Sequence, residues 1–258
     1  MKRGQITVYM IVGVVILILV VLLFYFRGSL LREVSSEKQI EISSVPEQFT
    51  EVQEEIKACT DKFVLDSIYT LGVYGGYFYR DNLNKIEYLG VNLTYLHYGK
   101  KSYTPSVTAM EQELSRFINE NLLFNCNINS TNVGVNYGKG VNYGKITSQV
   151  DIKDSSVIVS VNWPIQLKKG SLTSEIDKIS LSYPSRLGKI RNVVDLIVKQ
   201  QIRDKPQLCL TCMSRIAADN NLFVNTYNQD GDVIFLVIDM SEQKDSEAYK
   251  FWYVGDYQ

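Results

Sequence analysis

The apolar run near the start of the chain constrains the fold more than any other feature of the sequence. From Ile6 to Phe26 no residue is charged and almost none is polar. About 20 such residues are needed for a helix to cross a ~30 Å hydrocarbon core, and each Ile, Leu, Val or Phe favours insertion by roughly 0.3 to 0.6 kcal/mol. The run therefore predicts a transmembrane helix at residues 5–26 rather than a buried helix of a soluble domain.

A cleaved secretory signal is the main alternative for this run, because Lys2 and Arg3 supply a basic start. The apolar part of such a signal is usually about 7 to 15 residues long, which is shorter than the run. Residues 24–27, Phe-Tyr-Phe-Arg, also lack the small residues of a cleavage site. We therefore expect the helix to stay on the protein.

The orientation of the span does not follow from basic residues, because they lie on both sides of it. Acceptor sequons at Asn92 and Asn129 can be glycosylated only on a secreted surface, and four cysteines suit an oxidising compartment. These features predict a single-pass protein of the cell membrane with its C-terminal domain outside. The expected partners are the lipid bilayer and, through self-assembly or otherwise, envelope proteins. A formal net charge of −1 without a basic stripe argues against nucleic acid.

Beyond the span, composition and periodicity divide the chain into three regions. Residues 27–46 are polar and mixed in charge, which predicts a stalk or linker. Residues 47–130 predict a helix-hairpin-helix subdomain, and residues 131–258 predict an antiparallel α+β subdomain. The expected fold class is α+β: one N-terminal transmembrane helix followed by an antiparallel-sheet ectodomain covered by about three helices.

Hydrophobic spacing locates the main elements. Apolar residues three and four apart predict helices from Glu47 to about Gly72, from Ser106 to just before Cys126, and from Ser185 to before Pro206. Alternating segments between residues 146 and 183 predict a meander of strands. Near the C-terminus, Asp230-Gly231 between two apolar runs predicts a hairpin.

The cysteines are the sharpest candidates for chemistry. Cys59 lies on the apolar face of the first predicted helix and Cys126 just past the second, so the two are candidates for a bridge. The motif Cys209-Leu210-Thr211-Cys212 allows three interpretations: a local structural disulfide, a redox-active disulfide, or a four-thiolate metal site with Cys59 and Cys126. A helix, rather than a strand, is predicted before the motif, and no proline follows Pro206, so a thioredoxin is not indicated.

Other motifs are incomplete. His97 is the only histidine, which excludes histidine-rich metal sites and favours a hydrogen-bonded or surface strand histidine. Residues 140–145 have the wrong glycine spacing for a phosphate loop. A calcium loop around residues 228–232 would have Thr226 at its first ligand position and Val237 at its last, so its bidentate carboxylate is missing. Asn162-Trp163-Pro164 is typical of a strand bulge or edge. We expect no catalytic residues, no metal and no cofactor, and the sequence favours a protein that is not an enzyme.

The start Lys2-Arg3-Gly4-Gln5, followed directly by the apolar run, resembles the class III signal peptides of archaeal type IV pilin-like proteins. The resemblance implies that a prepilin peptidase cuts between Gly4 and Gln5 on the cytoplasmic side, so that residues 1–4 are a leader and the helix stays for membrane retention or filament packing. Tyr9 departs from the family, because major pilins carry a glutamate at this fifth mature position. The chain is also similar to uncharacterised single-pass surface proteins of small archaea.

These observations support two hypotheses of different class. The first is a membrane-anchored extracytoplasmic protein with a structural, adhesion or envelope-assembly role. The alternative is a membrane-anchored thiol-disulfide redox protein that uses Cys209 and Cys212. A ligand-binding module built on the tyrosine-rich strands, or on the repeated VNYGKG segment that begins at Val135, is also open.

Overall fold

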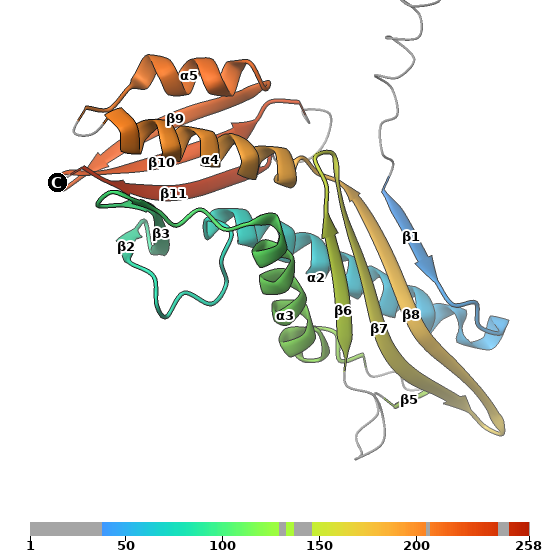
Figure 1. Ribbon diagram of the computed structural model, residues 1–258. Helices are drawn as coiled ribbons and strands as arrows, with labels where there is room; N and C mark the ends of the chain where they lie inside the picture. The colour runs from blue at the N-terminus through green and yellow to red at the C-terminus, as the bar shows by residue number, and fades with distance from the viewer. Residues whose placement is uncertain (1–37, 129–132, 137–145, 205–206, 242–247, 258) are drawn as a thin grey trace, which may run out of the picture. The chain divides into compact units, whose positions relative to one another are not determined.

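The computed structural model describes residues 38–128, 133–136, 146–204, 207–241 and 248–257, which lie in the compact unit Glu37–Gln258. This part of the chain is α+β, with two β-sheets and four α-helices (Figure 1). None of its helices combines the length and the apolar character that a membrane crossing needs. The span expected at residues 5–26 and the processing residues Gly4 and Gln5 lie outside the described residues.

The first sheet has the strand order β1-β8-β7-β5, and β6 also pairs with β7. Its strands are β1 (Gln39–Ile42), β5 (Gly134–Asn136), β6 (Thr147–Ile152), β7 (Ser156–Lys169) and β8 (Leu172–Pro184). All pairs are antiparallel, and the register of β7 shifts between Asn162 and Ile165, around Pro164. Proline cannot donate a ladder hydrogen bond, so the bulge predicted here is confirmed.

Strand β1 falls inside the stretch expected to be a linker. Gln39–Ile42 pairs with Ile179–Ser182 of β8, and Ile40 and Ile42 pack against the main core. The expectation of a stalk as far as residue 46 is therefore wrong for these four residues. Four residues with only two apolar side chains are too short to give a reliable strand pattern, and the open edge of β8 selects their conformation.

The second sheet has the order β2-β3-β11-β10-β9, with β4 beside β3. Its strands are β2 (Lys85–Tyr88), β3 (Val91–Tyr98), β4 (Lys101–Ser102), β9 (Leu222–Gln229), β10 (Asp232–Asp239) and β11 (Lys250–Asp256). Strands β3 and β11 run parallel, so this sheet is mixed rather than antiparallel as expected. No turn joins these two strands, and their relative direction is therefore not encoded locally. The sheet takes strands from both sides of residue 130, the expected boundary between subdomains.

The described residues form four α-helices, one more than the three or so expected: α2 (Thr50–Val73), α3 (Val107–Asn125), α4 (Leu187–Asp204) and the short α5 (Leu210–Ala218). A 3-10 turn, η1 (Glu47–Phe49), precedes α2. The start of α3 is fixed by Ser106, whose Oγ accepts a hydrogen bond from the Ala109 N–H at 3.0 Å. The helix positions predicted from apolar spacing are confirmed.

The main core lies between the helices and the inner faces of the sheets. Trp163 of β7 and Tyr183 of β8 are among its largest buried side chains. The Tyr183 hydroxyl donates to the backbone carbonyl and to Oδ1 of Asp61 on α2, both at 3.0 Å. Burial first, and then the Asp61 charge and hydrogen bond, raise the pKa of Tyr183. This contact fixes α2 across the first sheet.

Candidate functional site

Cys59 and Cys126 form a disulfide that joins the middle of α2 to the end of α3. Their Cα atoms are 5.7 Å apart, and 67 positions separate them in the sequence. A loop of this length stabilises the fold by about 4 kcal/mol in the chain-entropy model. The bridge expected from sequence is present, and its place between two packed helices makes it structural.

Cys209 and Cys212 form the second disulfide, which closes a loop across only three positions. The same model gives so short a loop about 2 kcal/mol, roughly half the effect of the other bridge. Cys209 is the N-cap residue of α5, and both cysteines are half-buried. All four cysteines are thus paired, which leaves no thiolate for the four-thiolate metal site considered above.

Two residues of α4 contact the two cysteines of the second disulfide, and Tyr257 near the C-terminus contacts one of these two residues. The Gln201 side chain is 1% exposed, and its Oε1 accepts hydrogen bonds from the Cys209 N–H at 3.2 Å and from the Tyr257 hydroxyl at 2.9 Å. Oδ2 of Asp204 lies 4.0 Å from the Cys212 sulfur. Burial, followed by the Asp204 charge, raises the pKa of Tyr257. The motif is therefore held by a buried amide and faces a carboxylate.

The potential ligand atoms of Asp204, Cys209 and Cys212 lie within 4.8 Å of one another. Metals bind the thiolate form of cysteine, and both sulfurs here are in a disulfide, so the three residues do not offer a thiolate site in this oxidation state. Sequence reasoning did not identify Asp204 or Gln201. The available signal was their position, three residues apart on one face of the helix that precedes the motif.

The sequon at Asn92 begins in β3. The Asn92 side chain is exposed, but Thr94, which supplies the sequon hydroxyl, is fully buried and donates to the Tyr74 carbonyl at 3.1 Å. A transferase that reads both residues would therefore need β3 before it is incorporated into the sheet. The second sequon, at Asn129, lies outside the described residues, and so does the repeat that begins at Val135, except for Val135 and Asn136 at the end of β5.

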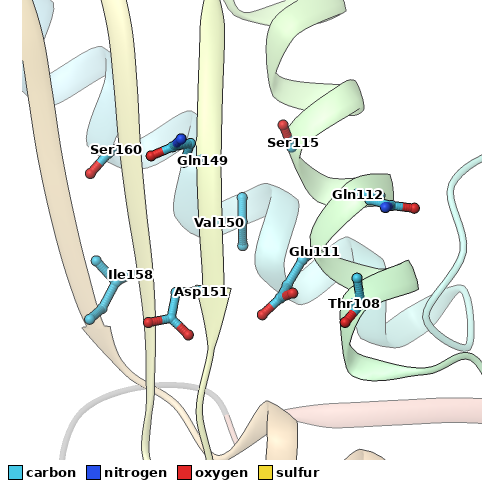
Figure 2. A pocket seen from close by; sticks show the side chains of 9 residues that line it. All are labelled: Thr108, Glu111, Gln112, Ser115, Gln149, Val150, Asp151, Ile158 and Ser160. Carbon is cyan, nitrogen blue, oxygen red and sulfur yellow. The ribbon is translucent and has the colours of Figure 1, made fainter.

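A shallow groove of about 480 Å³ lies where α3 faces β6 and β7 (Figure 2). Its lining consists of Thr108, Glu111, Gln112, Ser115, Gln149, Val150, Asp151, Ile158 and Ser160. Figure 2 shows Glu111 pointing from the helix toward β6. The lining is rich in hydroxyl, amide and carboxylate groups, and none of its side chains is aromatic.

Two residues of this lining, Ser115 and Glu111, form hydrogen bonds between α3 and β6. Ser115 Oγ donates to the Ser148 carbonyl at 2.8 Å, and Ser148 Oγ donates back to the Ser115 carbonyl at 3.1 Å. The Ile152 N–H donates to Glu111 Oε1 at 3.0 Å. Because β6 is an edge strand, these helix side chains satisfy backbone groups that would otherwise be open to another strand. The groove is thus mainly the place where side chains of α3 cover the open edge of β6.

An aromatic patch, made of Tyr88, Tyr227 and Trp252, lies on the second sheet. The three ring centroids are 6.0 to 6.2 Å apart, and the rings belong to a small apolar cluster separate from the main core. Leu89, at the β2–β3 turn, is 83% exposed and has φ of 52°. Left-handed backbone costs a bulky residue roughly 1 to 2 kcal/mol, and such strain gathers at functional sites.

His97 is a hydrogen-bonded strand histidine, as expected. It is 1% exposed, its Nε2 lies 3.1 Å from the Gly99 carbonyl, and its ring meets the Tyr257 ring edge to face. The segment weighed as a calcium loop is the β9–β10 turn, with left-handed Asp230 and Gly231. The predicted hairpin is confirmed there.

Comparisons with protein-family models, with curated proteins and with solved structures give no match.

Proposed function

We propose that the chain is a single-pass membrane protein whose folded domain lies outside the cell membrane and serves in envelope structure, adhesion or assembly, as a pilin-like subunit. One combination carries the proposal: an uncharged run at residues 6–26 precedes a domain whose four cysteines are all in disulfides. The run is long enough to remain in a bilayer, and disulfides persist in oxidising compartments.

The segment between the apolar run and the folded domain is short. Residues 27–38 separate the apolar run from β1, and an extended chain spans at most ~3.6 Å per residue, so the domain stays within roughly 40 Å of the bilayer. A domain tethered so closely meets other envelope proteins and further copies of itself in two dimensions, which raises their effective concentration.

The aromatic patch supports a role in assembly, with a second copy of this chain as the partner. It places three half-buried rings together on the second sheet, and the exposed Leu89 follows Tyr88 in the β2–β3 turn. Aromatic residues are enriched in protein interfaces, and a formal net charge of −1 gives two copies little mutual repulsion. Tyr9, in place of the filament-building glutamate, favours contact through the domain rather than through a helical filament core.

Cell fractionation tests the proposal. The full chain should stay in the membrane pellet after alkaline carbonate washing, and protease added to intact cells should digest the domain. A variant that lacks residues 6–26 is the control and should leave the membrane fraction. Recovery of the full chain as a soluble cytoplasmic monomer would overturn the proposal.

A further inference from the structure

We infer that Cys209 and Cys212 form a thiol-disulfide exchange site that oxidises dithiols of other proteins, with Asp204 and Gln201 as its positioning residues. The inference goes beyond the proposed function, because it assigns a reaction to one end of α5 and does not require membrane anchoring.

The two sulfurs are not equivalent. Cys209 occupies the N-cap position of α5, and its sulfur lies 3.8 Å from the Thr211 hydroxyl in an exposed contact. The Cys212 sulfur, in a partly buried contact, faces the Asp204 carboxylate. A helix N-terminus favours a thiolate, so Cys209 is the sulfur that an incoming thiolate attacks and that later leaves most easily. Cys212 is the sulfur that is displaced when the disulfide opens.

The surroundings of the motif favour exchange over a purely structural bridge. Gln201 bonds the Cys209 backbone on both sides: its Oε1 accepts from the N–H at 3.2 Å, and its Nε2 donates to the carbonyl at 3.4 Å. The turn is therefore anchored to α4 by a buried amide that does not depend on the S–S bond. The site can open and close its disulfide without losing its backbone position.

Asp204 provides an acceptor that the disulfide itself does not use. Its Oδ2 accepts from Gln200 Nε2 at 2.8 Å, which orients the carboxylate toward Cys212. A disulfide sulfur has no proton to donate, whereas a Cys212 thiol does. Asp204 therefore has a hydrogen-bond partner in the reduced site that is absent in the oxidised site, and it stabilises the reduced dithiol.

The reaction balances as a two-electron exchange. A substrate thiolate attacks the Cys209 sulfur, the Cys209–Cys212 bond breaks, and a substrate–Cys209 mixed disulfide forms. Cys212 leaves as a thiolate, takes a proton from solvent and donates it in a hydrogen bond to Asp204. The second substrate thiolate then attacks the substrate sulfur of the mixed disulfide and releases Cys209 as a thiolate. The substrate dithiol is oxidised to a disulfide, and the protein disulfide is reduced.

The test follows both disulfides in the full chain, purified in detergent, during incubation with reduced and oxidised glutathione. Acid quenching, alkylation and peptide mass spectrometry report each pair separately. Cys209–Cys212 should open at least about a hundredfold faster than Cys59–Cys126 and reach a measurable equilibrium with glutathione. Equal opening rates, or no opening of Cys209–Cys212, would overturn the inference.

Variants separate positioning from folding. Asp204→Asn should shift the glutathione equilibrium about fivefold or more toward the disulfide, because the thiol loses a charged acceptor, and Asp204→Glu should restore it. Asp195→Asn is the matched control on the same helix, since Asp195 pairs with Lys199 rather than with the motif. Identical equilibria for Asp204→Asn and Asp195→Asn would contradict the role of Asp204.

Discussion

At the scale of single residues, two side chains occupy environments that residues of their type usually avoid. Leu89 is a large apolar residue with positive φ at an exposed turn, and Gln201 is an amide that is almost fully buried. The sequence identified the cysteines, because thiol chemistry depends on residue type. It did not identify Asp204 or Gln201, because a carboxylate or an amide becomes part of a site only through its neighbours in the fold.

Replacement of Leu89 separates strain from assembly. Leu89→Asn should stabilise the domain by about 1 kcal/mol, because asparagine tolerates left-handed backbone, and it should weaken self-association by removing apolar surface. Urea denaturation and sedimentation velocity measure the two effects. Leu172→Gln is the control, since Leu172 is also an exposed leucine beside a hairpin turn but lies on the first sheet. Unchanged association of Leu89→Asn would count against the aromatic patch as a contact surface.

Tyr183 is one of the buried tyrosines that make the stability of the fold depend on alkaline pH. Its pKa is raised in the folded state, so the neutral phenol is favoured there. The neutral Tyr183 phenol therefore adds to the free energy of unfolding at pH values below the ordinary tyrosine pKa of about 10. This contribution falls as the pH rises above that value. Tyr183→Phe should cost about 1 kcal/mol at neutral pH, through the lost hydrogen bonds, but should show a smaller loss between neutral pH and pH about 11.

Urea denaturation at the two pH values measures this difference. Tyr98→Phe, at a tyrosine that is 45% exposed, controls for the removal of a phenol. An equally steep alkaline loss in Tyr183→Phe and in the unmodified chain would show that Tyr183 does not contribute to this dependence on alkaline pH.

At the scale of elements, local patterns determined most of what was predicted. Apolar spacing located α2, α3 and α4, and Asp230-Gly231 located the β9–β10 hairpin, because periodicity and turn chemistry are encoded within a few residues. Strand β1 and the parallel pairing of β3 with β11 were missed. Both depend on which edge of a sheet is free to pair. A free edge exists only once the rest of the sheet has folded, so it is not encoded in a short stretch of sequence.

The contact between α4 and the β6–β7 turn is tight enough to reverse a normal helix preference. A Cβ at Gly188 would lie 2.6 Å from the Lys153 carbonyl oxygen. Gly188→Ala should therefore destabilise the domain by roughly 1 to 3 kcal/mol through overpacking, although alanine is favoured over glycine in a helix by about 1 kcal/mol. Leu196→Ala, at an exposed position on α4, should change stability by no more than about 0.5 kcal/mol. Urea denaturation compares the two, and a more stable Gly188→Ala would contradict the packing argument.

At the scale of the whole molecule, the chain contains an apolar run, a short connecting segment and a domain with two disulfides of different character. Cys59–Cys126 closes a long loop and links two helices, whereas Cys209–Cys212 closes a short loop beside a carboxylate. The predicted location depends on the first residues of the chain, and the predicted chemistry depends on the second disulfide. The two parts can therefore be tested separately.

Intact-mass and N-terminal analysis of the membrane-extracted protein tests the central claim most directly. We predict a chain that retains residues 6–26, that begins at Gln5 if the leader is removed, and that is lighter by the four hydrogens that two disulfides remove. Any attached glycan would appear as added mass. A mature chain that begins after the apolar run, or one with four free thiols, would contradict the account of a membrane-retained protein with an extracytoplasmic domain.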